Sequence, residues 1–357
     1  MEISNQNKLE EKITSDVVFP KIRTKLGLSA DDFRDQILNN FPEVIAPLNF
    51  RAEDEIVPST ILGIDGTILD LKAENKENSR SSVGAAVSPG LINSRPDYLE
   101  FSKSKIIKSK SREEDMLHMK DLEYEIFNEI SENLKLDEIV MVDGPIWSIL
   151  EDIPKMLILK ENIYQILNID KLKKYEENIK TKPHLYIVKD FESQDLKEIF
   201  KFLDDDINEL AYKRVADALL RENETFLEQL HPNKKLSSYG FLESKLGESD
   251  GIKDIYNRIL SYTRKHCKSE ILKLGTNRSC IKIQYFDNEI FRQNKEKIIN
   301  GLEVEMNGIQ KEPYCLRFSE YTATRKCIDE IINNQMEEKL NMEPIDFLFN
   351  VPFQVRT

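Results

Sequence analysis

The sequence predicts a mixed α/β protein, in which helices pack against a β-sheet. Short apolar runs bounded by turn residues recur along the chain, which is typical of strands. They alternate with longer stretches whose apolar residues recur every three or four positions, which is typical of helices. The chain has 357 residues, 40% of them hydrophobic, so it is long enough to bury a sizeable core.

The helices are predicted from apolar spacing and from capping residues. The first 50 residues are predicted to be a helical segment, because the pattern over residues 31–38 follows Ser29, a suitable N-cap. The other predicted helical stretches are residues 113–134, 150–180, about 193–275 and 315–340. The predicted strands are residues 60–64, 67–71, 82–87, 138–142, 184–189, 279–286 and 289–292.

The charge balance limits how this protein could bind nucleic acid. With 51 basic and 64 acidic residues the net charge is −13, so its surface as a whole would repel DNA. Any such binding must rest on a local basic patch or on metal ions. The run FSKSKIIKSKSR at residues 101–112 holds five cations and no acid. Lys108 and Lys110 are therefore candidate phosphate contacts, and the alternative is an ordinary solvated loop.

The next features bear on where in the cell the protein works. No apolar run approaches the ~20 residues of a membrane span, and the polar, acidic start of the chain is unlike a secretory signal. The four cysteines form no CxxC pair and the four histidines are scattered, so neither predicts a metal site. We expect reduced thiols in a cytoplasmic protein.

Two Asp-Gly pairs follow apolar strand-like runs. They are Asp65-Gly66 and Asp143-Gly144. Aspartates at the ends of neighbouring strands would project into one cleft and form a paired-carboxylate site for a hard divalent cation. The alternative is that both pairs are ordinary turns, since Asp-Gly is a favoured turn dipeptide.

The stretch around the first pair reads ILGIDGTILD and partly matches the DxDGT signature of aspartyl-phosphate phosphatases. In that signature the first Asp is the nucleophile. Here Gly63 takes its place. Because glycine cannot form an aspartyl phosphate, the sequence argues against this chemistry.

Several short motifs occur in an order that resembles the NurA nuclease family. They are IDGT at residues 64–67, the small-residue strand SVGAAV at 82–87, VDGP at 142–145, VK at 188–189, FR at 291–292 and EPYCLRFSE at 312–320. The resemblance implies a ribonuclease-H-like mixed sheet flanked by helices. It implies a nuclease domain over residues 51–357, with the mainly helical stretch at about 193–275 as an insertion.

The resemblance also implies a set of site residues. Asp65, Asp143 and a helical glutamate would be the catalytic, metal-binding carboxylates. Glu123 fits best as the glutamate, and Glu125 and Glu114 are alternatives. Glu320 stands where the family has His or Asp, and it is a candidate fourth metal ligand. The family tyrosine falls on Glu312, which leaves Tyr314 as a substitute. The implied substrate-binding residues are Lys189, Arg292 and Tyr314, beside Lys108 and Lys110 from the basic run.

The activity that the resemblance implies is hydrolysis of phosphodiester bonds at DNA ends with Mn²⁺ or Mg²⁺. Such nucleases are homodimers that work with a HerA-type hexameric ATPase, in DNA repair or in phage defence. This chain has no GxxxxGK[ST] motif, so an ATP-driven step would need another protein. The alternatives are a non-catalytic scaffold of a DNA-processing complex with a degenerate nuclease fold, and an unrelated metal-dependent phosphohydrolase.

Overall fold

The structure is a computed structural model. It describes residues 45–48, 57–71, 80–94, 101–108, 111–135, 137–158, 169–188, 219–228, 251–274, 280–306 and 312–339, with residues 32, 34, 35, 38, 39, 216 and 217. Two candidate site residues, Lys110 and Lys189, lie outside the described residues, as do Ser29 and much of the predicted insertion.

The described residues contain one mixed sheet of nine strands in the order β1-β7-β8-β9-β6-β5-β2-β3-β4. The central pairs β2–β5 and β5–β6 are parallel, and the flanking pairs are antiparallel. The strands are β1 (Ile45–Pro47), β2 (Thr60–Leu71), β3 (Arg80–Asn93), β4 (Phe101–Lys108), β5 (Glu138–Asp143), β6 (His184–Val188), β7 (Glu224–Glu228), β8 (Cys267–Lys273) and β9 (Ile281–Phe286).

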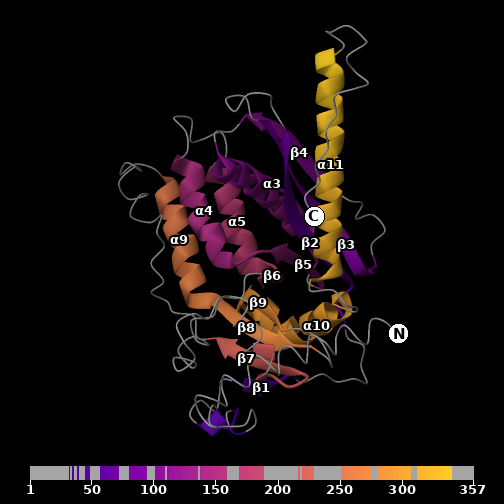
Figure 1. Ribbon diagram of the computed structural model, residues 1–357. Helices are drawn as coiled ribbons and strands as arrows, with labels where there is room; N and C mark the ends of the chain where they lie inside the picture. The colour runs from indigo at the N-terminus through magenta and orange to yellow at the C-terminus, as the bar shows by residue number, and fades with distance from the viewer. Residues whose placement is uncertain are drawn as a thin grey trace, which may run out of the picture.

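Helices cover both faces of the sheet (Figure 1). The first face carries α3 (Arg112–Asn133), α4 (Ile146–Ile158), α5 (Ile169–Thr181) and α9 (Gly251–His266). The second face carries α10 (Glu289–Glu305) and α11 (Tyr314–Lys339). This three-layer arrangement confirms the predicted mixed α/β class with flanking helices.

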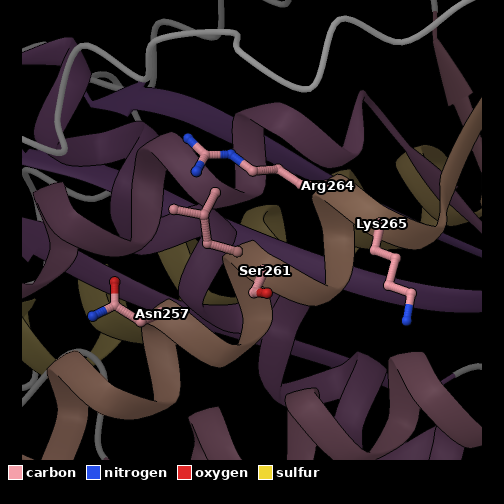
Figure 2. Close-up of a pocket in the computed structure, with 5 residues that line it drawn as sticks. Asn257, Ser261, Arg264 and Lys265 are labelled. Carbon is pink, nitrogen blue, oxygen red and sulfur yellow. The ribbon is translucent and has the colours of Figure 1, made fainter.

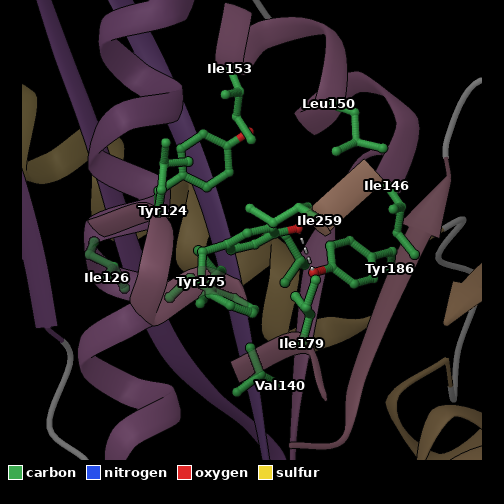
Figure 3. Packing of buried hydrophobic residues seen from close by; sticks show 14 of the residues in the cluster. Tyr124, Ile126, Val140, Ile146, Leu150, Ile153, Tyr175, Ile179, Tyr186 and Ile259 are labelled. Atoms are coloured by element: carbon green, nitrogen blue, oxygen red, sulfur yellow. Dashed lines mark hydrogen bonds between the residues drawn. The ribbon is translucent and has the colours of Figure 1, made fainter. Parts of the chain in front are cut away.

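The alternation of side chains along β5 shows why the sheet is buried on both sides. Val140 and Val142 join the core under the first-face helices, and Ile139 and Met141 join the core under α10 and α11. Figure 3 shows part of the first core, where the Tyr175 and Tyr186 hydroxyls lie 3.5 Å apart. Strands that are buried on both faces read as continuous apolar runs, as this one does.

Strand β2 corrects one prediction. Residues 60–64 and 67–71 are a single strand, because β3 pairs with β2 along nearly its whole length, including Asp65↔Ala86 and Gly66↔Ala85. The first Asp-Gly pair therefore lies inside a strand and is neither a strand end nor a turn. The second pair does follow a strand: β5 ends at Asp143, and Gly144 takes a positive φ of 97°.

Other boundaries also differ from the sequence predictions. Residues 289–292 begin helix α10, which Asn288 caps by accepting a hydrogen bond from the Phe291 N–H. Most of the basic run forms strand β4. Residues 45–47, inside the predicted N-terminal helical segment, form strand β1. The predicted helical insertion contributes strands β7 and β8 to the sheet as well as helix α9. These short strands are fixed by partners far away in sequence.

The cysteines and the helices bear on two further expectations from the sequence. All four cysteines are buried and free, as expected for reduced thiols. None of the helices in the described part of the chain combines the length and apolar character needed to cross a membrane.

Candidate active site

The two aspartates lie side by side on neighbouring parallel strands. Ile64 of β2 pairs in register with Val142 of β5, so the next residues, Asp65 and Asp143, occupy adjacent positions. Both follow residues that belong to the first-face core, so strand alternation directs both to the second face, toward α11. The strand register therefore places these two carboxylates on neighbouring positions, as predicted, although Asp65 comes from the middle of its strand.

Helix α11 holds β2 in place and explains Gly63. The single proton of the Ser319 hydroxyl is shared between the carbonyl oxygens of Gly63, at 2.5 Å, and Cys315, at 2.8 Å. A Cβ atom on residue 63 would overlap the backbone of Cys315 and Leu316. The DxDGT nucleophile is thus excluded by packing as well as by chemistry, because an aspartate side chain has no room there.

Glu123 approaches from the opposite face of the sheet. It is buried on α3, and its Oε1 atom lies 2.5 Å from the position that a Cβ on Gly66 would occupy. Strand β5 has already ended at this level, since its last residue is Asp143. Groups from both faces can therefore meet around the end of β5. We call Asp65, Glu123 and Asp143 the strand-end cluster.

One lysine lies among these carboxylates. Lys120 Nζ is 2.6 Å from Glu123 Oε2, with the two side chains only 18% and 5% exposed. Burial by itself lowers the pKa of Lys120, but attraction by Glu123, Asp65 and Asp143 outweighs it, so the pKa is raised. The ammonium group is thus held in its charged form by the whole cluster.

The carboxylates of the cluster also act on one another. Burial raises the pKa of Glu123, and repulsion by Asp143 and Asp152 adds to the rise, while Lys120 opposes it. Asp65 Oδ1 accepts a 2.7 Å hydrogen bond from the Gly66 N–H. Glu123 Oε1 is buried and has no hydrogen-bond partner in the described structure. A buried carboxylate oxygen without a donor carries a free-energy cost, which a cation could remove.

Sequence reasoning missed two members of this environment. Lys120 stands three residues before Glu123, a spacing that places both on one side of a helix, so it could have been found. Asp152 comes from α4, and burial raises its pKa to about 6, with Lys120 opposing that rise. Nothing in the local sequence of α4 indicates that Asp152 lies near the cluster.

The two α11 candidates lie on the helix that packs against β2. Helical spacing puts Glu320 on one stripe with Leu316 and Thr324, and Thr324 Oγ1 lies 3.4 Å from Thr67 Oγ1 on β2. Because Thr67 and Asp65 share a face of β2, this stripe runs along the edge of the site. Glu320 itself is exposed. Tyr314 begins α11, and its ring packs 4.7 Å from that of Phe318.

The alternative glutamates are engaged elsewhere. Glu125 pairs with Lys103 at 2.6 Å and with Lys171 at 3.5 Å. Glu114 lies in the first turn of α3, more than two turns before Glu123. The placement therefore favours Glu123 among the three.

Two candidate substrate-binding residues are not brought next to the cluster. Lys108 pairs with Arg80 at the far end of β4, while Ser102 is the β4 residue level with Asp65. The two positions are six residue steps apart, which corresponds to roughly 20 Å of strand. Arg292 lies on α10, which follows the end of β9. That end of β9 lies beside His184, the first residue of β6, whereas Asp143 lies at the opposite end of the parallel strands. It pairs with Asp287 at 3.3 Å.

The chemistry of the cluster suits a divalent cation, although the side chains are not drawn together. Within the described residues, no three His, Cys, Asp or Glu side chains are grouped closely enough to hold a metal ion. Carboxylate oxygens are nevertheless the donors that Mg²⁺ and Mn²⁺ prefer, and the ammonium of Lys120 stands where a positive charge is needed. The donor set therefore fits such an ion once the lysine moves aside.

A second feature, an open hollow on α9, lies away from these carboxylates. Asn257, Leu260, Ser261, Arg264 and Lys265, all from that one helix, line it (Figure 2). In Figure 1, α9 and α11 lie at opposite sides of the molecule. None of these five lining residues is acidic, and none belongs to the strand-end cluster.

Comparison with known proteins relates the whole fold to one group of structures. No protein-family model matches the sequence, and no curated protein matches it. Among solved structures, the NurA nuclease from Sulfolobus solfataricus is similar at a TM-score of 0.50 and 13% identity, covering 94% of this chain and 99% of that one. A second NurA structure gives 0.52 and 10%, covering 97% and 99%. A NurA bound to dAMP and manganese gives 0.50 and 12%, covering 87% and 91%. The chain therefore has a NurA-type fold.

Proposed function

We propose that this chain is a metal-dependent nuclease that hydrolyses phosphodiester bonds of DNA, with Mn²⁺ or Mg²⁺ as its cofactor. The observation that carries the proposal is the strand-end cluster, in which three acidic residues from β2, β5 and α3 surround one lysine. The shared fold supports it, since one similar NurA structure holds manganese and dAMP. At 10–13% identity, the fold alone does not assign the activity.

The three residues of the strand-end cluster would have different roles, depending on the strand or helix that carries each of them. Asp65 and Asp143 are fixed by the strand register, so they would provide the rigid part of a cation site. Glu123 would close the site from α3, with the oxygen that now lacks a hydrogen-bond partner. When bound, the cation supplies Lewis-acid activation of water and neutralises charge on the phosphodiester. No side-chain nucleophile is required for this type of reaction.

Acidic residues also bear on how DNA is held. A net charge of −13 gives the chain little electrostatic attraction for DNA. We propose that the protein acts as a homodimer with a HerA-type hexameric ATPase, as the family resemblance implies, and that this partner provides much of the grip on DNA. Tyr314 and Glu320 on α11 are the proposed contacts at the rim of the site.

The test is cleavage of linear single- and double-stranded DNA with Mn²⁺, Mg²⁺ or EDTA, with and without a HerA-type partner. Asp65→Asn is expected to lower the rate at least about 100-fold, since even residues behind a metal ligand cost 10–100-fold. The matched control is Asp121→Asn, which alters an equally buried aspartate outside the cluster.

Absence of cleavage in every condition, with folded protein and partner present, would overturn the proposal. The alternative, a non-catalytic scaffold, predicts that outcome together with unchanged partner binding by Asp65→Asn. Hydrolysis of small phosphoesters without cleavage of DNA would instead indicate a different metal-dependent phosphohydrolase.

A further inference from the structure

Lys120 is more buried than lysine side chains usually are. Its side chain is 18% exposed and ends 2.6 Å from the buried carboxylate of Glu123. The charged groups that act on it come from every element around it: Glu123 from its own helix, Asp65 from β2, Asp143 from β5 and Asp152 from α4. Carboxylates from four elements thus act on the Lys120 ammonium group.

A cation stabilises such an arrangement. Buried like charges repel one another, and the repulsion is strong where water is excluded. An ammonium group on a flexible four-carbon stem can supply positive charge between them and can also move away. Lys120 reaches Glu123 from the preceding turn of the same helix, so no backbone movement is needed for it to leave.

We propose that Lys120 is an internal counter-ion that holds the strand-end cluster together before a divalent cation binds, and that cation binding displaces it. It is a positioning residue that competes with the metal ion and thereby weakens metal affinity. The inference rests on the proposed function, because it requires that these carboxylates bind a divalent cation. It adds that the chain itself carries the competitor.

The first experiment measures Mn²⁺ binding by calorimetry for the wild type, Lys120→Met and Lys120→Arg. Removing the competing charge is expected to tighten Mn²⁺ binding about fivefold or more, the lower end of typical coupling between sites. Lys120→Arg keeps the charge and should stay close to the wild-type affinity. Lys103→Met is the matched control, because Lys103 also pairs with glutamates of α3 but outside the cluster.

The second experiment uses the wild-type protein and does not depend on a variant that folds. Amine acetylation is followed by mass spectrometry, with and without saturating Mn²⁺. Displacement should make the Lys120 amine react several-fold faster when Mn²⁺ is present, while the reaction at Lys103 stays constant. The effect should disappear when EDTA removes the ion.

The outcomes separate the two proposals. If the wild type binds no Mn²⁺ or Mg²⁺, the proposed metal-dependent function is overturned. If it binds Mn²⁺, but Lys120→Met has unchanged or weaker affinity and Lys120 reactivity does not rise, the counter-ion inference is wrong and the proposed function stands. Tighter binding by Lys120→Met, without a matching change in Lys103→Met, supports the inference.

Discussion

Helix α3 contributes acids to two groups that differ in how their charge is balanced. The first, which we call the ion-pair network, contains Asp121, Glu125 and Glu129 with Lys103, Lys105 and Lys171. Its three carboxylates meet three ammonium groups at distances of 2.5–3.6 Å. The second, the strand-end cluster, has three carboxylates and one ammonium group. Both groups use residues within one turn of each other on the same helix.

The difference separates an arrangement that stabilises the fold from one that is poised to bind something. The ion-pair network supplies its own cations and fastens β4 and α5 to α3. In the strand-end cluster, three acidic residues from different elements instead act together on Lys120. Titratable groups that perturb one another in one place are typical of functional sites. The predictions below test whether the contrast holds.

The largest expected effect is on catalysis. Glu123→Gln should lower Mn²⁺-dependent DNA cleavage at least about 100-fold, because it removes a proposed metal ligand. Glu125→Gln makes the same chemical change two residues away, in the ion-pair network, and should alter the rate by less than about threefold. A threefold change corresponds to roughly 0.5 kcal/mol, the usual size of the effect of a surface substitution. The measurement is the initial rate at saturating Mn²⁺. Equal losses in the two variants would remove the distinction between the two groups.

This pair of glutamates also marks the limit of what the sequence could predict. The apolar runs before Asp65 and Asp143 located both aspartates, and parallel pairing of their strands brought them together. The choice between Glu123 and Glu125 stayed open, because α3 carries acids on several sides. Packing favours Glu123, through its contact over Gly66 and the lysines that engage Glu125.

The fold shows the same division between local and distant causes. The long helices α3 and α11 were predicted nearly to their ends, since apolar spacing over many residues is a strong local signal. Strand β7, five residues long, was not predicted, because its stability comes from pairing with β1 and β8. The start of α10 was mistaken for a strand, because four residues cannot distinguish the two patterns.

The second prediction compares stability without metal. Asp121→Asn should lower the free energy of unfolding by about 1 kcal/mol, because it leaves Lys105 and Lys171 without their shared buried partner. Burial raises the pKa of Asp121 in spite of Lys171 and Lys105, so the loss of its charge offsets part of this cost. Asp143→Asn should leave stability unchanged or raise it by up to about 1 kcal/mol, because it relieves repulsion on Glu123.

The measurement is urea unfolding in the presence of EDTA, with equal m-values as the control for a shared unfolding transition. A large loss of stability in Asp143→Asn would show that the strand-end cluster is as structural as the ion-pair network. In that case the proposed functional distinction between the two groups would lose its physical basis.

The smallest expected effect is a pH dependence at Asp152, the fourth acid that acts on Lys120. Burial raises the pKa of Asp152 to about 6 in the folded protein, above its ordinary value of 3.8. Between these two values the folded state binds more protons than the unfolded state, so the contribution of Asp152 to stability falls as pH rises and is constant above pH 6. Asp152→Asn removes this contribution.

The variant should therefore match the wild type near pH 4 and exceed its stability at pH 7. We expect a gain of about 1.5 kcal/mol, half of what the full pKa shift corresponds to, because the side chain is partly exposed. Urea unfolding at both pH values in EDTA measures the difference. A gain that is equal at pH 4 and pH 7 would mean that burial does not raise the pKa of Asp152 in the folded protein. The contrast with the ion-pair network would then rest on the three acids of the strand-end cluster alone.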